Sequence, residues 1–84
     1  MSVSIFVLDV DEFHPLVVHS KEMPGVIVSG PLKGYWRIES SSKITFDRKE
    51  LGFKPAVWYG SLTGGYVGKI LEFSRDTLII DEAI

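Results

Sequence analysis

Residues 55–81 carry the sequence PAVWYGSLTGGYVGKILEFSRDTLIID, and this stretch decides the predicted fold class. Apolar, β-branched and aromatic residues fill three runs, which the turn-forming residues at 63–65 and 74–77 separate. Runs of this kind between turn residues are typical of consecutive antiparallel strands. The segment therefore predicts a β-meander within a small β-protein.

Similar strand patterns continue toward the N-terminus. Residues 3–10 predict a first strand with apolar residues on both faces, which is typical of a central strand or of one that a second chain covers. Residues 47–52 predict a helical turn, because Asp47 is a suitable N-cap and Gly52 a suitable C-terminal stop. Further short strands are expected at residues 16–18, 26–28, 35–39 and 43–46.

Together these segments predict one all-β domain over residues 1–84. The expected architecture is a small, mostly antiparallel bent sheet or barrel of about six to eight short strands, with at most one short helical turn near residues 47–52. A chain this short buries only about 60–65% of its unfolded surface, so its stability margin is thin. It has no cysteine, yet 45% of its residues are hydrophobic. We expect a second copy or a partner to cover some of this apolar surface.

The N-terminal segment favours a cytoplasmic protein. Residues 1–9 contain no basic residue before the apolar run, and Asp9 interrupts that run too early for a signal-peptide core. No stretch approaches the roughly 20 apolar residues of a membrane helix. The absence of cysteine agrees with a reducing compartment. We therefore expect a cytoplasmic protein with no membrane partner.

The aromatic residues of the predicted meander are the strongest candidates for a binding surface. Successive residues of a strand point to opposite faces, so Trp58 and Tyr59 are not expected to share one core. One of them is then left for a partner, near Tyr66 and the turn residue Thr63. Aromatic residues on a β-surface are preferred anchors in protein interfaces. This surface predicts docking on another protein, or self-association as a homodimer.

A second set of residues suggests nucleic-acid binding. Tyr35 and Arg37 are expected on the same face of one strand, and Lys43 and Lys49 follow them in the sequence. Small barrels bind single strands by stacking bases on aromatic residues beside a basic groove. The formal net charge of −2 argues against this function, because dedicated nucleic-acid binders are usually basic.

Patterns typical of catalysis and cofactor binding are weak. His19 and Ser20 are adjacent in a predicted polar loop and are poorly placed as a catalytic pair. Gly64 and Gly65 precede a predicted strand and not a helix, so they indicate a hairpin turn instead of a phosphate-binding loop. The densest set of potential metal ligands consists of Asp9, Asp11, Glu12 and His14. No second ligand cluster of known spacing accompanies them, so no catalytic residue, metal or cofactor is expected.

The leading hypothesis is therefore a non-enzymatic accessory or inhibitory module. It would dock on a larger protein, or on itself, through an aromatic β-surface. One alternative is the nucleic-acid-binding barrel, whose affinity would fall steeply with salt. The other alternative is a barrel with a pocket for a small apolar ligand, lined by Trp36, Trp58 and Phe73.

Overall fold

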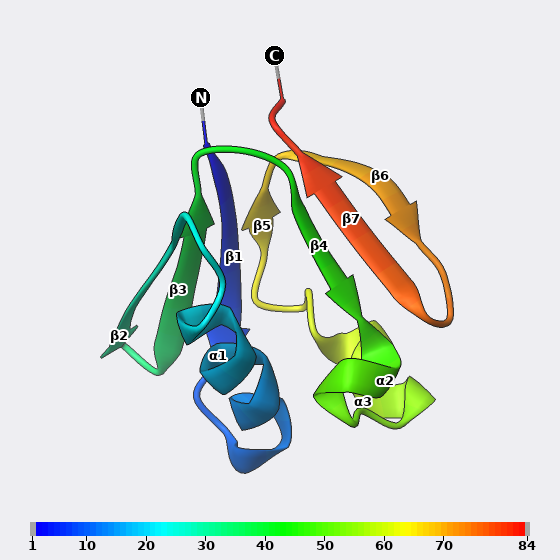
Figure 1. Cartoon of the computed structure of the whole chain (residues 1–84). Helices are drawn as coiled ribbons and strands as arrows, with labels where there is room; N and C mark the ends of the chain where they lie inside the picture. Colours follow the sequence, from blue (N-terminus) through cyan, green and yellow to red (C-terminus); the bar gives the residue numbers. More distant parts are fainter. Residues whose placement is uncertain (1, 84) are drawn as a thin grey trace.

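Seven strands in two antiparallel sheets form most of the computed structural model, which describes residues 2–83 (Figure 1). The strands are β1 (Val3–Leu8), β2 (Val26–Leu32), β3 (Tyr35–Ser40), β4 (Ile44–Asp47), β5 (Tyr66–Val67), β6 (Lys69–Phe73) and β7 (Thr77–Asp81). The helices are the 3-10 helix η1 (Asp11–Phe13) and the α-helices α1 (His14–Lys21), α2 (Arg48–Leu51) and α3 (Pro55–Gly60). None of the helices in this part of the chain is long and apolar enough to cross a membrane.

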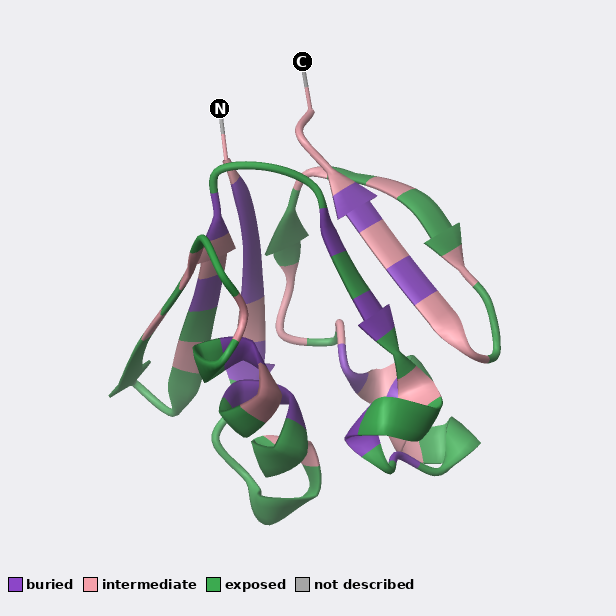
Figure 2. Cartoon of the chain, viewed as in Figure 1, coloured by how far each residue is buried: buried purple, intermediate pink, exposed green. Residues whose placement is uncertain are grey.

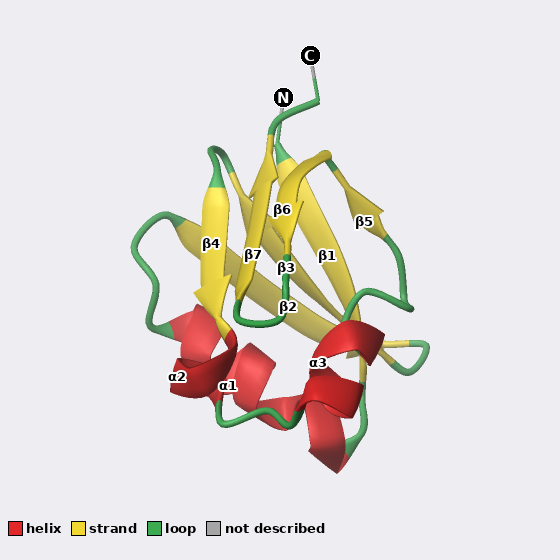
Figure 3. Cartoon of the chain, turned by 90° about the vertical axis from the view of Figure 1, so that its right-hand side faces the viewer, coloured by secondary structure: helices red, strands yellow, loops and turns green. Residues whose placement is uncertain are grey.

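The two sheets face each other across the core. The first sheet has the strand order β2-β3-β1-β5, and the second has the order β4-β7-β6. Neighbouring strands in both sheets are antiparallel. Figure 3 shows the helices gathered at one end of the sheets. The outer surfaces of the two sheets, which face away from the core, therefore have no helical layer over them.

The hydrophobic core lies between the inner faces of the sheets and under α1. β1 contributes Val3, Ile5 and Val7, which alternate along the strand and are at most 1% exposed. Leu16 and Val17 of α1 are buried against them in the same cluster. Figure 2 shows the buried positions on β1, β3, β4 and β7. One continuous cluster therefore holds both sheets together.

The predicted fold class is confirmed, because the chain is mostly β and its sheets are antiparallel. Residues 2–83 form two open sheets and no closed barrel. The helical turn expected near residues 47–52 is α2. Its N-cap Asp47 accepts a hydrogen bond from the backbone N–H of Lys49 at 2.9 Å, and Gly52 ends it with a φ of 73°.

Residues 16–18 were predicted as a strand, and this prediction is wrong. They lie in α1, where Leu16, Val17 and Ser20 are buried together. That spacing places the three side chains on one side of a helix. Pro15 in the first turn is compatible with a helix start, because the missing N–H has no partner there in any case. Core burial therefore outweighs the strand preference of the valines.

Residues 55–60 are also helical, so the expected meander lacks its first strand and more than one helical turn is present. Pro55 opens α3, and Trp58 fills the core at 1% exposure. The indole Nε1–H of Trp58 donates a hydrogen bond to the backbone oxygen of Ser74 at 2.8 Å. The aromatic and β-branched composition of this run resembles a strand, but a helix brings Trp58 to the β6–β7 turn.

Arg48 connects α2 to the β6–β7 turn. Its Nη2 and Nε donate to Asp76 Oδ1 at 2.8 and 3.2 Å, and its Nη1 donates to the backbone oxygen of Phe53 at 2.8 Å. The Arg48 side chain is only 13% exposed. The hydrogen bond from Arg48 holds the pKa of the Asp76 carboxyl below its usual value. Arg48 thus belongs to the fold and not to a basic surface patch.

A pH dependence of stability follows from this pair. The pKa of Asp76 is lower in the folded chain than its unfolded value of about 3.9, so the pair stabilises fully above that value. The stabilisation is lost as pH falls through the folded-state pKa. We expect the urea midpoint of the wild type to fall more between about pH 6 and about pH 2 than that of Asp76→Asn. Equal falls would show that the pair adds no pH-dependent stability.

Candidate functional site

The outer face of the sheet that contains β1 and β3 is apolar, and no other element in residues 2–83 forms a layer over it. Pairing register places six apolar residues on this side, and they are termed the apolar face: Phe6, Leu8, Ile27, Leu32, Tyr35 and Val67. Ile27 and Leu32 are 66% and 73% exposed. Large apolar patches at the surface of small soluble proteins commonly mark interaction sites.

The outer side of the second sheet is mostly polar. Alternate residues of β4, β6 and β7 point away from the core, and they include Thr45, Glu72 and Thr77. An antiparallel sheet with one solvated face normally has polar residues there. The second sheet follows this rule apart from Ile79 and the half-exposed Leu71, whereas the first sheet has six apolar residues on its outer side. The apolar face is therefore the surface of this protein that most needs an explanation.

Arg37 crosses the middle of the apolar face. Its guanidinium carbon lies 5.9 Å from the ring centroid of Phe6. Its Nη2 donates to Glu39 Oε2 at 3.0 Å and to Ser4 Oγ at 3.4 Å. The side chains of Arg37 and Glu39 are 50% and 35% exposed. A charged pair, with Ser4 and Ser29 beside it, thus lies among the six apolar residues of this side.

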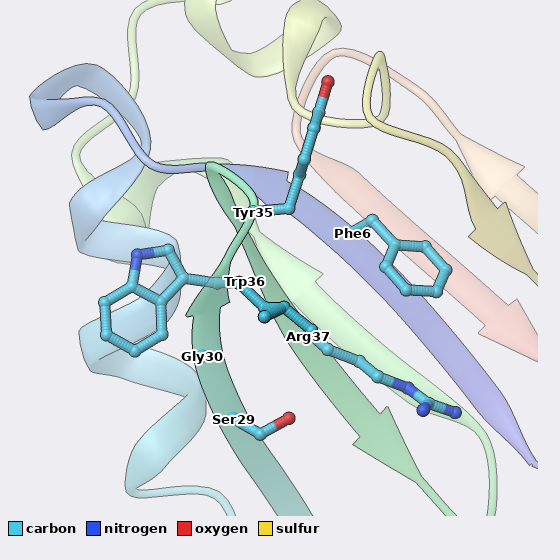
Figure 4. A pocket seen from close by; sticks show the side chains of 7 residues that line it. Phe6, Ser29, Gly30, Tyr35, Trp36 and Arg37 are labelled. Atoms are coloured by element: carbon cyan, nitrogen blue, oxygen red, sulfur yellow. The ribbon is translucent and has the colours of Figure 1, made fainter.

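A hollow of about 330 Å³ opens on this side of the sheet (Figure 4). In Figure 4, Trp36 points toward α1, whereas Phe6, Tyr35 and Arg37 point to the opposite side of β3. The irregular pairing between Ser29 and Leu32 bends β2 here. The residues that line the hollow are Phe6, Ser29, Gly30, Leu32, Tyr35, Trp36 and Arg37. The cavity is thus mainly apolar and has one charged residue, Arg37.

Gly30 explains how β2 comes so close to β3. Its φ is 112°, a conformation that L side chains rarely adopt. A Cβ at this position would lie 2.9 Å from the backbone oxygen of Tyr35 and 3.3 Å from the Cα of Trp36. Only glycine therefore permits the bend that shapes this wall of the hollow.

The loop between α3 and β5 closes the end of the apolar face near Tyr35. The backbone N–H of Phe6 donates to the oxygen of Gly65 at 3.0 Å, which attaches the loop to β1. A Cβ on Gly64 would collide with the backbone oxygen of Phe6 and lie 3.0 Å from Cε1 of Tyr35. Thr63 precedes this glycine, and its Oγ1 donates to the oxygen of Gly60 at 2.8 Å. The loop and Tyr35 are therefore neighbours on one surface.

The comparisons with known proteins concern the fold. No protein-family model matches the chain, and no curated protein matches its sequence. A similar chain is found in the solved structure of a phenol hydroxylase–regulatory protein complex. The TM-score is 0.77, with 13% identity, over 99% of this chain and 100% of that chain. The two chains share a fold. This likeness covers the described chain from end to end and establishes the architecture alone.

The structure brings together only part of the predicted aromatic surface. Tyr35 and Arg37 share one side of β3, as their alternation predicts, and the loop that contains Thr63 lies beside Tyr35. Trp58 is buried in the core and is not available to a partner. Tyr59 is 51% exposed on α3, where its ring centroid lies 5.6 Å from that of Phe73.

Tyr66 lies on β5, at the edge of the first sheet, and is 42% exposed. It is paired with Ile5, whose side chain points to the core. Its neighbour Val67 is paired with Ser4 and belongs to the apolar face. The predicted interface at Tyr59 and Tyr66 stays a prediction.

The residues proposed for the alternative functions are dispersed. Lys43 follows β3 in a loop and Lys49 lies on α2, so neither extends β3 beside Tyr35 and Arg37. Trp58 and Phe73 pack against each other at 5.7 Å in the core, whereas Trp36 lies on β3 and donates to Asp9 Oδ1 at 2.9 Å. Of the three residues expected to line an apolar-ligand pocket, only Trp36 lines the hollow on the apolar face, so that hollow is not the expected pocket.

The weak patterns of catalysis also find structural explanations. The hydroxyl of Ser20 is buried and donates to the backbone oxygen of Leu16 at 2.7 Å, while the ring of His19 packs 6.2 Å from that of Phe46. Within residues 2–83 no group of three or more metal-ligating side chains gathers. Gly64 and Gly65 follow α3 and precede β5, so no helix starts at this loop.

Sequence reasoning missed Phe6, Leu8, Ile27 and Leu32 as members of the surface. One observation pointed to part of it: residues 3–10 are apolar on both sides of a strand. The inner side is accounted for by the core, so Phe6 and Leu8 are the residues left for a partner. Ile27 and Leu32 can be assigned to this face only from the pairing of β2 with β3, which the sequence does not specify.

Gly64 provides a test of how the loop is attached to β1. We expect Gly64→Ala to lower the free energy of unfolding by about 2 kcal/mol or more. The new methyl group would collide with the backbone oxygen of Phe6, which is held in β1 by its strand pairing. Gly60→Ala is the matched control, because a Cβ there would find only Phe13 Cζ at 3.7 Å. Urea denaturation of both variants measures the difference. Similar stability of the two variants would contradict the close contact at Gly64.

Proposed function

We propose that this chain is a non-enzymatic regulatory component that docks on a larger enzyme through the apolar face. The observation that carries the proposal is the uncovered apolar side of one sheet, beside a second sheet with an ordinary polar side. The similar chain comes from a complex of a hydroxylase with a regulatory protein, which supports an enzyme of that kind as the partner.

The size of the apolar face favours reversible docking. Three strands of six or seven residues and the two-residue β5, about 4.8 Å apart with a rise of about 3.3 Å per residue, present roughly 330 Å². Stable complexes bury about 800 Å² on each partner, and obligate dimers bury considerably more. The area of the face and its neighbouring loops therefore fits a component that binds its partner reversibly. The homodimer expected from the sequence stays a prediction.

The chemistry of the face supports recognition and not catalysis. Arg37 is paired with Glu39 and contacts Ser4, so these contacts hold its guanidinium in place on the apolar face. Arginine keeps its proton in proteins and cannot act as a general base. Apolar side chains beside such a pair are a common composition for a protein interface. A chain that binds an enzyme and changes its activity would use both the apolar side chains and the charged pair of this face.

Two matched substitutions test the docking surface. Leu32→Asp places a charge on the apolar face, and Leu71→Asp places the same charge on β6, where leucine is 50% exposed. Burying an exposed leucine contributes about 2 kcal/mol, so we expect Leu32→Asp to weaken binding at least tenfold. Leu71→Asp should bind like the wild type, and both variants should fold, because both positions are exposed.

The assay uses the hydroxylase-type enzyme captured by the tagged wild-type chain from its source cells. Binding is measured by isothermal calorimetry, and the turnover rate of the enzyme is measured with and without the chain. We expect the chain to change that rate and Leu32→Asp to remove the effect. If Leu71→Asp or Tyr59→Ala abolished binding while Leu32→Asp retained it, the α3–β6 side would be the interface and the apolar face would not.

A further inference from the structure

Arg37 has more hydrogen-bonding capacity than the fold uses. Only its Nη2 has acceptors, namely Glu39 Oε2 and Ser4 Oγ. Among residues 2–83, no acceptor lies within hydrogen-bond distance of its Nε or Nη1. An arginine presents five N–H donors in a fixed fork. The guanidinium is therefore held in place through one nitrogen, with its other donors open to water on the apolar face.

Covering the apolar face would change the surroundings of these donors. The Arg37 side chain is 50% exposed, so docking of a partner on Phe6 and Leu32 removes water from the guanidinium between them. A buried donor without an acceptor is strongly unfavourable, and more so when it is charged. Glu39 does not solve this, because it binds Arg37 through Nη2 alone and leaves Nε and Nη1 without an acceptor. The partner must supply the acceptor.

A carboxylate fits this position best. Its negative charge makes a hydrogen bond from the free Nε–H or Nη1–H of Arg37 charge-assisted, and charge-assisted hydrogen bonds are roughly twice as strong as neutral ones. The hollow beside Arg37 is lined by Phe6, Leu32 and Tyr35 and has room for one large apolar side chain. Resting on the proposed function, we propose that the apolar face docks a protein segment that inserts an apolar side chain into this hollow and places an aspartate or glutamate on Arg37.

A protein segment fits the surface better than other occupants. Leu8, Ile27 and Val67 lie on the same face outside the hollow, so a small molecule in the hollow would leave them uncovered. Nucleic acid would meet one arginine that is already paired with Glu39. A second copy would bring the same arginine and a glutamate that is already bound. A protein partner with a free carboxylate would both cover the apolar residues and provide an acceptor for Arg37.

Selection from a displayed library of random 12-residue peptides tests the partner's chemistry directly. The baits are the wild-type chain, Arg37→Glu, Arg37→Gln and Lys49→Glu. Lys49→Glu makes the same charge change as Arg37→Glu but on α2, away from the face. We expect peptides bound by the wild type to be enriched at least threefold in Asp and Glu next to Phe, Leu or Trp. Lys49→Glu should select the same peptides.

The Arg37 variants should lose this preference. Arg37→Gln should bind the selected acidic peptides at least tenfold more weakly, and Arg37→Glu should favour Lys and Arg in their place. Arg37→Gln keeps a hydrogen-bond donor near Ser4, so its melting temperature checks that the fold is intact. Four results would overturn the proposal: no peptide is selected, no acidic enrichment is found, the enrichment persists on Arg37→Glu, or self-association competes with every peptide.

The captured enzyme separates this inference from the proposed function. If the enzyme binds the wild type and Arg37→Gln equally, the carboxylate partner is wrong while docking on the enzyme stands. If no hydroxylase-type enzyme binds but acidic apolar peptides are selected in an Arg37-dependent way, the proposed function is wrong while the recognition chemistry of the face stands.

Discussion

The structure depends on a strand that is apolar on both sides while only one side is covered. Val3, Ile5 and Val7 of β1 enter the core, and the second sheet and α1 bury them. Phe6 and Leu8 of the same strand point to the other side, where no described helix or sheet forms a layer over them. A sheet with two apolar faces requires two covering layers. The chain supplies one, and the proposed partner supplies the second.

Two glycines shape this uncovered side. Gly30 lets β2 bend against β3 and forms a wall of the hollow, and Gly64 lets the loop after α3 lie against β1 and Tyr35. Both positions lie beside backbone atoms that a larger residue would displace. The face is thus built from rigid strands and closely held loops. A preformed surface of this kind binds with little loss of conformational entropy.

The sequence indicates the fold class more reliably than it indicates the site. Alternation in residues 35–39 correctly places Tyr35 and Arg37 on one side, and Asp47 with Gly52 correctly bounds α2. α1 and α3 escape prediction because valine and tryptophan favour strands locally, whereas burial of Leu16 and Trp58 requires helices. The hollow depends on the irregular β2–β3 pairing, which arises from contacts between strands and not from any local pattern.

Hydroxyl-radical footprinting of the three tyrosines tests the central claim most directly. Tyr35 lies on the apolar face, Tyr59 on α3 and Tyr66 on β5, and they are 40%, 51% and 42% exposed, so each reports on its own surface with similar sensitivity. The oxidation rate of each ring is compared between the free chain and its complex with the larger enzyme. The account predicts strong protection of Tyr35 and an unchanged rate for Tyr59. Protection of Tyr59 with an unchanged rate for Tyr35 would contradict it.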